Sequence, residues 1–526
     1  MRVVALAGAF AFLIAGLALA EPQAAPPQVT IAQGALAGTT DSGISVFKDI
    51  PFAAPPVGAL RWRAPQPAPN WSGVLDASSF GPICMQGPRP PGRDYRENLK
   101  QSEDCLSLNV WTPNIAPEKK LPVMVWIYGG GFREGGSAVS LYDGTELAQH
   151  GVIVVTINYR LGYFGFLDLP SLAAEHPDEP HGNYGLLDQI AALKWVQANI
   201  ASFGGDPSNV TIFGESAGGM SVNDLMVSPL TRGLFSKAIS ESGLGLIHTP
   251  TEAEGQTHGA AFAAKMNAGD LTGAEQITAL RARPAAAVAN AAPSDDSGGM
   301  GPMVDGTVLP DQVAKLFAQG KIATATYIAG SNSNEASLMP GLRMSNAKMF
   351  DQLGDKLPAV RAIYESGGKL SDDEFGHQLF DDAVFASGAQ GFAHYAARAG
   401  QNSYVYYFGY VADALRSRES GVGHGGEIVY VFGLHGLSRT PRGAMMASFA
   451  TDKDRKMIAL VQDYWTNFAK TGDPNGADLP EWPTSTDAAP RTMVFGDDSK
   501  AVAGFREKQL GVIYMGWTAR TGDPVP

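Results

Sequence analysis

Continuous apolar runs recur along the chain and end at glycines or polar residues. Residues 121–128 and 152–157 are almost wholly apolar, which is typical of strands covered on both faces. Residues 185–200 carry apolar side chains at helical spacing and precede a β-branched run at 209–213. Further strand candidates are 106–111, 237–240, 326–330 and 404–408. Because these runs alternate with helical stretches, we predict an α/β fold with a mostly parallel central sheet and helices on both faces.

Other stretches are predicted to surround this sheet. Residues 29–47 alternate and contain three glycines, which favours an N-terminal hairpin, whereas the proline-rich stretch 51–69 favours an extended segment. Residues 258–292 and 347–400 are alanine-rich and are predicted to form helical insertions over the C-terminal edge of the sheet, and 294–301 a loop. The alternation continues through both halves of the chain, so we predict one elaborated domain over residues 21–526.

The first 20 residues differ from the rest of the chain. Arg2 precedes an apolar run at 3–17, and the small residues Ala18 and Ala20 flank Leu19 before Glu21. This pattern is typical of a cleaved signal peptide, with an uncleaved membrane anchor as the alternative. We therefore predict an exported protein, periplasmic or secreted, without stable membrane association after cleavage.

Two cysteines are present, Cys84 and Cys105. In an exported protein they favour a disulfide, and two separate buried thiols are the alternative. A zinc site is not expected, because no histidine pair at metal-ligand spacing accompanies them.

The formal net charge of −13 opposes binding to nucleic acids or to anionic membrane surfaces. It does not restrict the choice of small-molecule substrate. The sequence leaves open whether the protein is a monomer or a homodimer.

A candidate nucleophile lies in the sequence Gly214-Glu215-Ser216-Ala217-Gly218. This G-x-S-x-G pattern follows a predicted strand and precedes a helix-compatible segment, which is the context of a nucleophile elbow. The sharp turn needs residues with almost no side chain two positions either side of the serine, and Gly214 and Gly218 meet that need.

A serine hydroxyl needs a neighbouring base, usually a histidine that a carboxylate orients. Three of the six histidines after Ser216, at 258, 377 and 394, fall in predicted helices. His424 lies between glycines in a loop after the strand candidate 404–408, where a general base is expected. We predict His424 as the base, with His435 and His248 as alternatives.

The acid is expected between the serine and the histidine in the chain. Glu335 follows the strand candidate 326–330 and therefore lies at the C-terminal edge of the predicted sheet. Asp305 is the alternative, although it precedes Gly306 in an ordinary Asp-Gly turn. We predict Glu335.

Attack on an ester carbonyl creates an oxyanion that needs preorganised N–H donors. Gly129, Gly130 and Gly131 end a predicted buried strand upstream of the serine, so the backbone there can approach a substrate closely. We predict the backbone N–H groups of Gly130, Gly131 and Ala217 as the oxyanion hole.

The sequence resembles the type-B carboxylesterase/cholinesterase family, especially its bacterial, para-nitrobenzyl-esterase-like members. The resemblance covers about residues 29–500 and is carried by the stretches 52–58, 102–111, 126–132, 158–160, 182–189, 203–207, 214–218, 424–433 and 465–475. It implies an α/β-hydrolase fold, a helix-lined gorge, and the same nucleophile, acid, base and oxyanion donors.

The resemblance adds three expectations and contains three departures. It implies an electrostatic role for Glu215, correspondence of Cys84–Cys105 to the family's first disulfide, and structural ion pairs of Arg61 with Glu103 and of Arg160 with Asp188. The family's second disulfide has no counterpart, and Ala336 stands where a glycine is usual after the acid. The first disulfide loop contains Tyr95 but no tryptophan, so choline esters are not expected as preferred substrates.

We predict a serine carboxylesterase that forms an acyl-enzyme and uses no metal or cofactor. The gorge is expected to be lined by Tyr95, Phe132, Leu246 and Ile247, together with the insertion 347–400. One alternative is a specialist for a single bulky ester, such as a toxin side-chain ester, a polyester or a lipid. A more remote one is a non-catalytic adhesion or binding module.

Overall fold

The computed structural model describes residues 25–88, 99–291 and 300–521. The predicted signal peptide at 1–20, Tyr95 and most of the predicted loop 294–301 lie outside the described residues.

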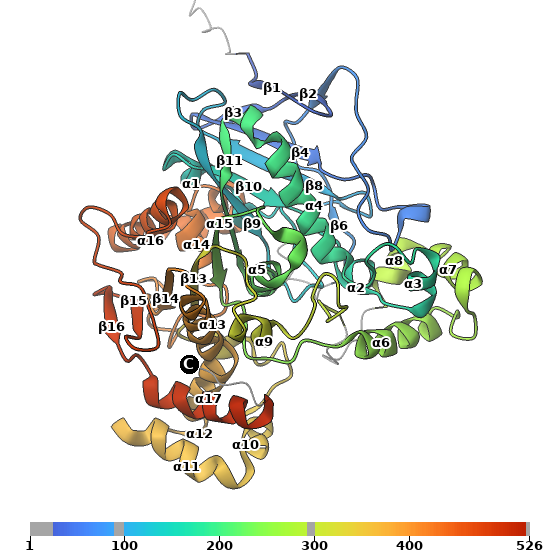
Figure 1. Ribbon diagram of the computed structural model, residues 1–526. Coiled ribbons are helices and arrows are strands. Elements are labelled where there is room, and N and C mark those ends of the chain that lie inside the picture. The colour runs from blue at the N-terminus through green and yellow to red at the C-terminus, as the bar shows by residue number, and fades with distance from the viewer. Residues whose placement is uncertain (1–24, 89–98, 292–299, 522–526) are drawn as a thin grey trace, which may run out of the picture.

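The described residues contain a sheet of 11 strands in the order β16-β15-β14-β13-β12-β11-β9-β10-β8-β4-β3 (Figure 1). Strands β9 to β15 pair in parallel, whereas β8, β4 and β3 at one edge and β16 at the other pair antiparallel. The strands are β3 (Thr39–Asp41), β4 (Ile44–Pro51), β8 (Ser107–Thr112), β9 (Leu121–Ile127), β10 (Ile153–Ile157), β11 (Gly205–Glu215), β12 (Lys237–Glu241), β13 (Thr326–Asn332), β14 (Ser403–Phe408), β15 (Arg491–Phe495) and β16 (Lys500–Ala503). The predicted mostly parallel sheet is confirmed.

The inner strands consist of apolar and β-branched residues because both of their faces are covered. Every residue of β10 is buried, and so are the last five of β9. Six of the seven predicted strands lie within two residues of their expected bounds, and β11 begins four residues before the predicted run 209–213. The N-terminal region differs, since it forms two hairpins rather than one: β1 (Gln28–Ile31) pairs with β2 (Gly34–Ala37), and β3 pairs with β4.

Helices pack on both faces of the sheet. The predicted helix 185–200 is α4 (Tyr184–Asn199), and α5 (Ala217–Val227) follows β11 directly. Helix α16 (Asp452–Thr471) packs on β9 and β11. It begins at a capping box formed by Thr451 and Asp454. The remaining helices near the sheet include α1 (Thr145–Gln149), α2 (Gly162–Phe166), α3 (Pro170–Glu175), α9 (Val313–Ala318), α14 (Ile428–Phe432) and α15 (Pro441–Ser448).

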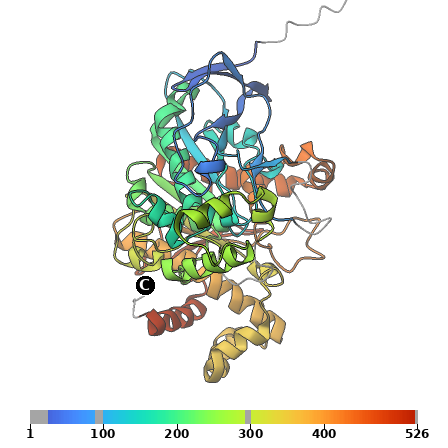
Figure 2. The ribbon, with the colours of Figure 1, turned by 90° about the vertical axis from the view of Figure 1, so that its right-hand side faces the viewer.

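The two predicted helical insertions are confirmed as helical. The first contains α6 (Glu252–Lys265), α7 (Gly273–Arg281) and α8 (Ala285–Ala289). The second contains α10 (Asn346–Leu353), α11 (Leu357–Tyr364), α12 (Asp372–Phe380) and α13 (Ser387–Arg398). In both views α10, α11 and α12 gather at one end of the molecule beside α17 (Glu507–Thr521) (Figures 1 and 2). They enclose a second hydrophobic cluster around Phe375 and Leu379, separate from the core of the sheet.

Covalent and ionic links join distant segments. Cys84 and Cys105 form the predicted disulfide. The guanidinium of Arg160 donates two hydrogen bonds of 2.7 Å to the buried carboxylate of Asp188. Arg61 pairs in the same way with Glu103, so both expected ion pairs are present. In the described part of the chain, no helix combines the length and apolar character that crossing a bilayer requires.

Candidate active site

Ser216 lies at a sharp turn between β11 and α5. Its backbone has φ 57° and ψ −123°, a strained conformation for a residue with a side chain. A Cβ atom on Gly218 would lie 1.9 Å from the carbonyl oxygen of Ile127, and one on Gly214 would lie 2.5 Å from the same oxygen. Only glycine fits at either position, which explains the two glycines of the motif.

Ser216, His424 and Glu335 form one hydrogen-bonded chain. Ser216 Oγ lies 2.8 Å from His424 Nε2, and His424 Nδ1 lies 2.6 Å from Glu335 Oε2. Glu335 follows β13 and is fully buried. The structure therefore brings together the three residues predicted as nucleophile, base and acid, although they come from segments 208 and 89 residues apart.

Two serines that were not predicted hold this chain in place. The Ser242 hydroxyl donates a hydrogen bond of 2.5 Å to Glu335 Oε1, which also accepts the backbone N–H of Asn332 at 2.8 Å. The Ser337 hydroxyl accepts the backbone N–H of His424 at 2.8 Å. Ser242 directly follows β12 at the same sheet edge as Glu335, and this position is the signal that could have identified it.

Glu215 adds a second carboxylate beside the imidazole. Its Oε1 lies 3.2 Å from His424 Nε2 without the geometry of a hydrogen bond. Burial alone would lower the pKa of His424, but the negative charges of Glu215 and Glu335 outweigh it, and the net effect is a raised pKa. Burial raises the pKa of Glu215 in turn. The carboxylates of Glu215 and Glu335 together make the imidazole of His424 a stronger base than a solvated histidine.

Two further buried carboxyl groups lie behind the site. Glu427 accepts a hydrogen bond from the amide of Asn332, and Glu241 accepts one of 2.8 Å from the indole of Trp465. Burial raises the pKa of Glu427 well above its usual range and that of Glu241 to about 8. Burial therefore disfavours the charged form of both carboxyl groups.

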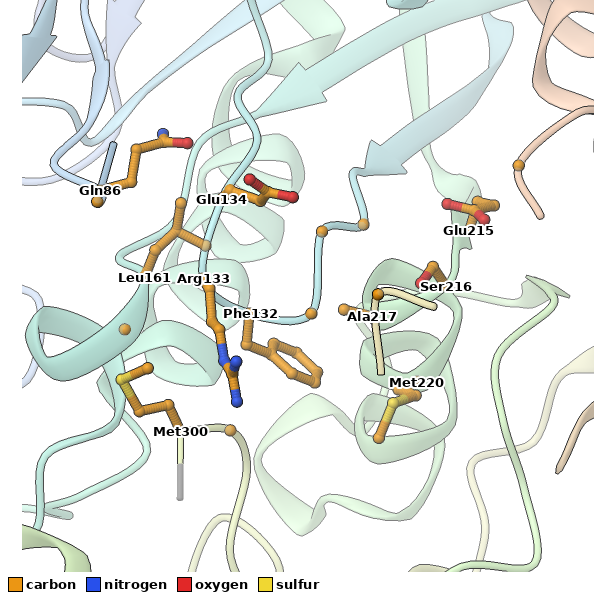
Figure 3. Close-up of a pocket in the computed structure, with 18 of the residues that line it drawn as sticks. Gln86, Phe132, Arg133, Glu134, Leu161, Glu215, Ser216, Ala217, Met220 and Met300 are labelled. Carbon is orange, nitrogen blue, oxygen red and sulfur yellow. The ribbon is translucent and has the colours of Figure 1, made fainter. Parts of the chain in front are cut away.

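The glycine loop after β9 faces the start of α5. Gly130 and Gly131 have φ values of 110° and 61°, which favour glycine. Within the described residues, the backbone N–H groups of Gly130, Gly131 and Ala217 have no hydrogen-bond acceptor. In Figure 3 the loop passes from the end of β9 toward Phe132, opposite Ala217 and Ser216. These three donors are available to a ligand.

A cavity of about 1990 Å³ opens around Ser216 and His424. Phe132 and Ile247 line it, as predicted. Leu246 does not line it but is buried in the hydrophobic core, because consecutive side chains of this loop point in different directions. Met220 points into the cavity from α5, and Met300 lies across from it (Figure 3). The lining is mostly apolar.

The alternative acid and bases lie in other networks. Asp305 Oδ1 accepts three backbone N–H groups of its own turn, from Thr307 to Leu309, as expected of an Asp-Gly turn. His248 lies 3.0 Å from Glu254, and His435 lies 3.2 Å from Asp41.

One group of residues away from the cavity has the composition of a metal site. Potential ligand atoms of Asp168, His181 and Glu252 lie within 4.8 Å of one another. His181 Nδ1 lies 2.9 Å from Asp168 Oδ1, and this hydrogen bond raises the pKa of His181. A hydrogen-bonded ion pair therefore explains why Asp168 and His181 lie together. No other such group is found in the described residues.

Comparison with known proteins connects this chain to a family. The model of the carboxylesterase family matches residues 25–374 and 368–512. The chain belongs to the carboxylesterase family. It is accordingly a carboxylic ester hydrolase with an α/β-hydrolase fold.

Relatives in this family match over most of their length. Para-nitrobenzyl esterase of Bacillus subtilis (strain 168) is 36% identical over 89% of this chain and 95% of its own. Liver carboxylesterase 1 of Oryctolagus cuniculus is 33% identical over 98% of both chains, and fumonisin B1 esterase of Sphingopyxis macrogoltabida is 37% identical over 86% of this chain and 83% of its own. A solved structure of a thermophilic PNB esterase has a TM-score of 0.78 at 33% identity, covering 93% of this chain and 99% of that one.

Proposed function

We propose that this carboxylesterase works through an acyl-enzyme formed on Ser216. His424 removes the proton of the Ser216 hydroxyl as the oxygen attacks the ester carbonyl, and then protonates the departing alcohol. Glu335 holds the imidazole in the tautomer whose Nε2 faces the serine. Water repeats the sequence in deacylation and releases the acid. The hydrogen-bonded chain from Ser216 through His424 to Glu335 is the observation that carries this proposal.

The charge that develops on the carbonyl oxygen needs its own donors. The N–H groups of Gly130, Gly131 and Ala217, which have no acceptor among the described residues, supply three. Each such donor contributes about 3–4 kcal/mol to the stability of a transition state. The N-terminal end of α5 adds a favourable dipole at the same point. Glu215 offsets the positive charge that His424 acquires when it takes the proton.

A hydrolysis assay with a matched pair of serine variants tests the proposal. The Ser216→Ala variant is expected to lose at least a thousandfold in kcat/KM on a chromogenic short-chain ester, whereas Ser140→Ala, a serine that lines the same cavity, is expected to keep it. Residual hydrolysis by Ser216→Ala within tenfold of the wild type would remove Ser216 from the mechanism.

The cavity favours a large ester as the natural substrate. Its volume of about 1990 Å³ exceeds the roughly 300–1000 Å³ of most small-molecule sites. One relative is named fumonisin B1 esterase. A specialist for one bulky ester is therefore the second candidate, and a screen that varies acyl length and alcohol bulk independently separates it from a general carboxylesterase. A narrow optimum at large esters supports the specialist.

We also propose export after removal of residues 1–20. The Cys84–Cys105 disulfide supports this, because disulfides persist mainly in oxidising compartments. Sequencing the N-terminus of the mature protein from a cell that exports it tests the proposal, with Glu21 as the expected first residue.

A further inference from the structure

Asp224 is a buried acid on the wall of the cavity. It lies on α5, the helix that begins directly after Ser216, and only 4% of its surface is exposed. It nevertheless belongs to the lining of the cavity that contains Ser216 and His424. None of the roles proposed above uses it.

The carboxyl group of Asp224 has no partner among the described residues. Its Oδ2 is shielded from solvent and accepts no hydrogen bond, and no lysine, arginine or histidine there pairs with it. Two basic side chains that line the same cavity are already engaged, since His248 pairs with Glu254 and Arg439 pairs with Asp41. Burial without a compensating charge raises the pKa of Asp224 to about 8.

Such a group is unusual because buried polar atoms nearly always have hydrogen-bond partners. An apolar residue of similar size would fill the same position on α5 without the desolvation cost. Because Asp224 lines the cavity, a ligand bound there can supply the partner that the described residues lack.

We propose that Asp224 binds a protonated primary or secondary amine carried by the ester that Ser216 attacks. The inference rests on the proposed function and assigns a substrate class to the same site: amphipathic esters with a distant ammonium group. An ammonium group supplies both the positive charge and the N–H donors that a buried carboxylate requires. Holding the carboxylate ionised at pH 7 against a pKa of about 8 costs only about tenfold in affinity, which a charge-assisted hydrogen bond in a desolvated site exceeds.

The spacing along α5 determines the distance between the ester and the amine. Asp224 follows Ser216 by eight residues, which is roughly 12 Å along a helix axis. Met220 lies halfway on the same face, and its side chain points into the cavity in Figure 3. The substrate is therefore expected to carry an apolar spacer between its ester carbonyl and its amine.

Two pairs of synthetic esters test the inference. The first compares the p-nitrophenyl ester of an ω-amino medium-chain fatty acid with that of the parent fatty acid. The second compares butyrate esters of an ω-amino medium-chain alcohol and of the parent alcohol. The readout is the ratio of kcat/KM for the amino ester to that for its parent, in the wild type, Asp224→Asn and Asp224→Leu.

A preference of about tenfold or more for one amino ester in the wild type, lost in both variants, is the expected result. The pair that shows it also identifies whether the amine lies on the acyl or the alcohol side. A preference that Asp224→Asn retains would overturn the inference in favour of neutral hydrogen bonding, and a ratio near one in the wild type would overturn it outright. Failure of the proposed function is distinct, because the parent esters would then be hydrolysed equally by Ser216→Ala.

Discussion

Replacing Glu215 by glutamine is expected to shift the pH dependence of hydrolysis. Glutamine keeps the size of the side chain but removes the negative charge that lies 3.2 Å from His424 Nε2. The charges of Glu215 and Glu335 together raise the pKa of His424 against the effect of burial. Without Glu215, the pKa of His424 is therefore expected to fall.

The size of this shift follows from the distance and from the state of Glu215. Two unit charges 4 Å apart interact with about 4 kcal/mol at an effective dielectric constant near 20, which corresponds to about three pKa units. Because burial also raises the pKa of Glu215, this carboxyl group is only partly ionised near neutral pH and exerts only part of that effect. We expect the pKa of His424 to fall by about one unit.

The sign follows from the role proposed for the histidine. Only neutral imidazole accepts the proton of Ser216, so kcat/KM rises with pH until His424 is deprotonated. A lower pKa in Glu215→Gln moves this acidic limb to lower pH. Stopped-flow or plate assays of kcat/KM from acidic to alkaline pH on a non-ionising ester measure the limb directly.

Glu254→Gln is the matched control, because Glu254 also lines the cavity but pairs with His248 on its rim. Its acidic limb is expected to match that of the wild type. A limb that stays in place in Glu215→Gln, or moves to higher pH, would refute the electrostatic coupling described here.

Three further substitutions test how the site is held together. Ser242→Ala removes a hydrogen bond to Glu335 and is expected to lower kcat about tenfold with little change in KM, and an unchanged kcat would leave Ser242 without a positioning role. Gly218→Ala places a methyl group 1.9 Å from a carbonyl oxygen, so urea unfolding is expected to show a loss of about 3 kcal/mol, and full stability would contradict the close packing at the elbow. Replacing both Cys84 and Cys105 by alanine opens a loop of 21 residues and is expected to cost about 3 kcal/mol of unfolding free energy, and a melting temperature equal to that of the wild type would contradict this.

Much of the sheet could be predicted from the sequence because its inner strands are covered on both faces. This burial makes strands such as β9 and β10 continuous apolar runs that stand out from their surroundings. The short strand β16 lies at the edge of the sheet with β15 beside it, and neither is a continuous apolar run, so the sequence does not predict them. Helix α16 was also missed, although its capping box and amphipathic spacing are visible in the sequence.

The residues of the proposed site also differ in how clearly the sequence marks them. Ser216, Glu335 and His424 could be predicted because each follows a strand that ends at one edge of the sheet. Ser242 also follows a strand that ends at this edge, but no motif marks it, and its contact with Glu335 becomes visible only once β12 pairs with β13. Asp224 lies in a helix without distinguishing neighbours, and only the three-dimensional structure shows that it lines the cavity without a partner among the described residues.

Covalent labelling of Ser216 tests the central claim most directly. Incubation with a fluorophosphonate, followed by peptide mass spectrometry, is expected to give one equivalent of label on Ser216, with hydrolysis lost in parallel. The Ser216→Ala variant is expected to take up no label, whereas Ser140→Ala is expected to be labelled like the wild type. Full hydrolytic activity in an unlabelled protein, or label on another residue with Ser216 unmodified, would contradict the acyl-enzyme mechanism. An absence of both label and hydrolysis would instead support a non-catalytic binding module.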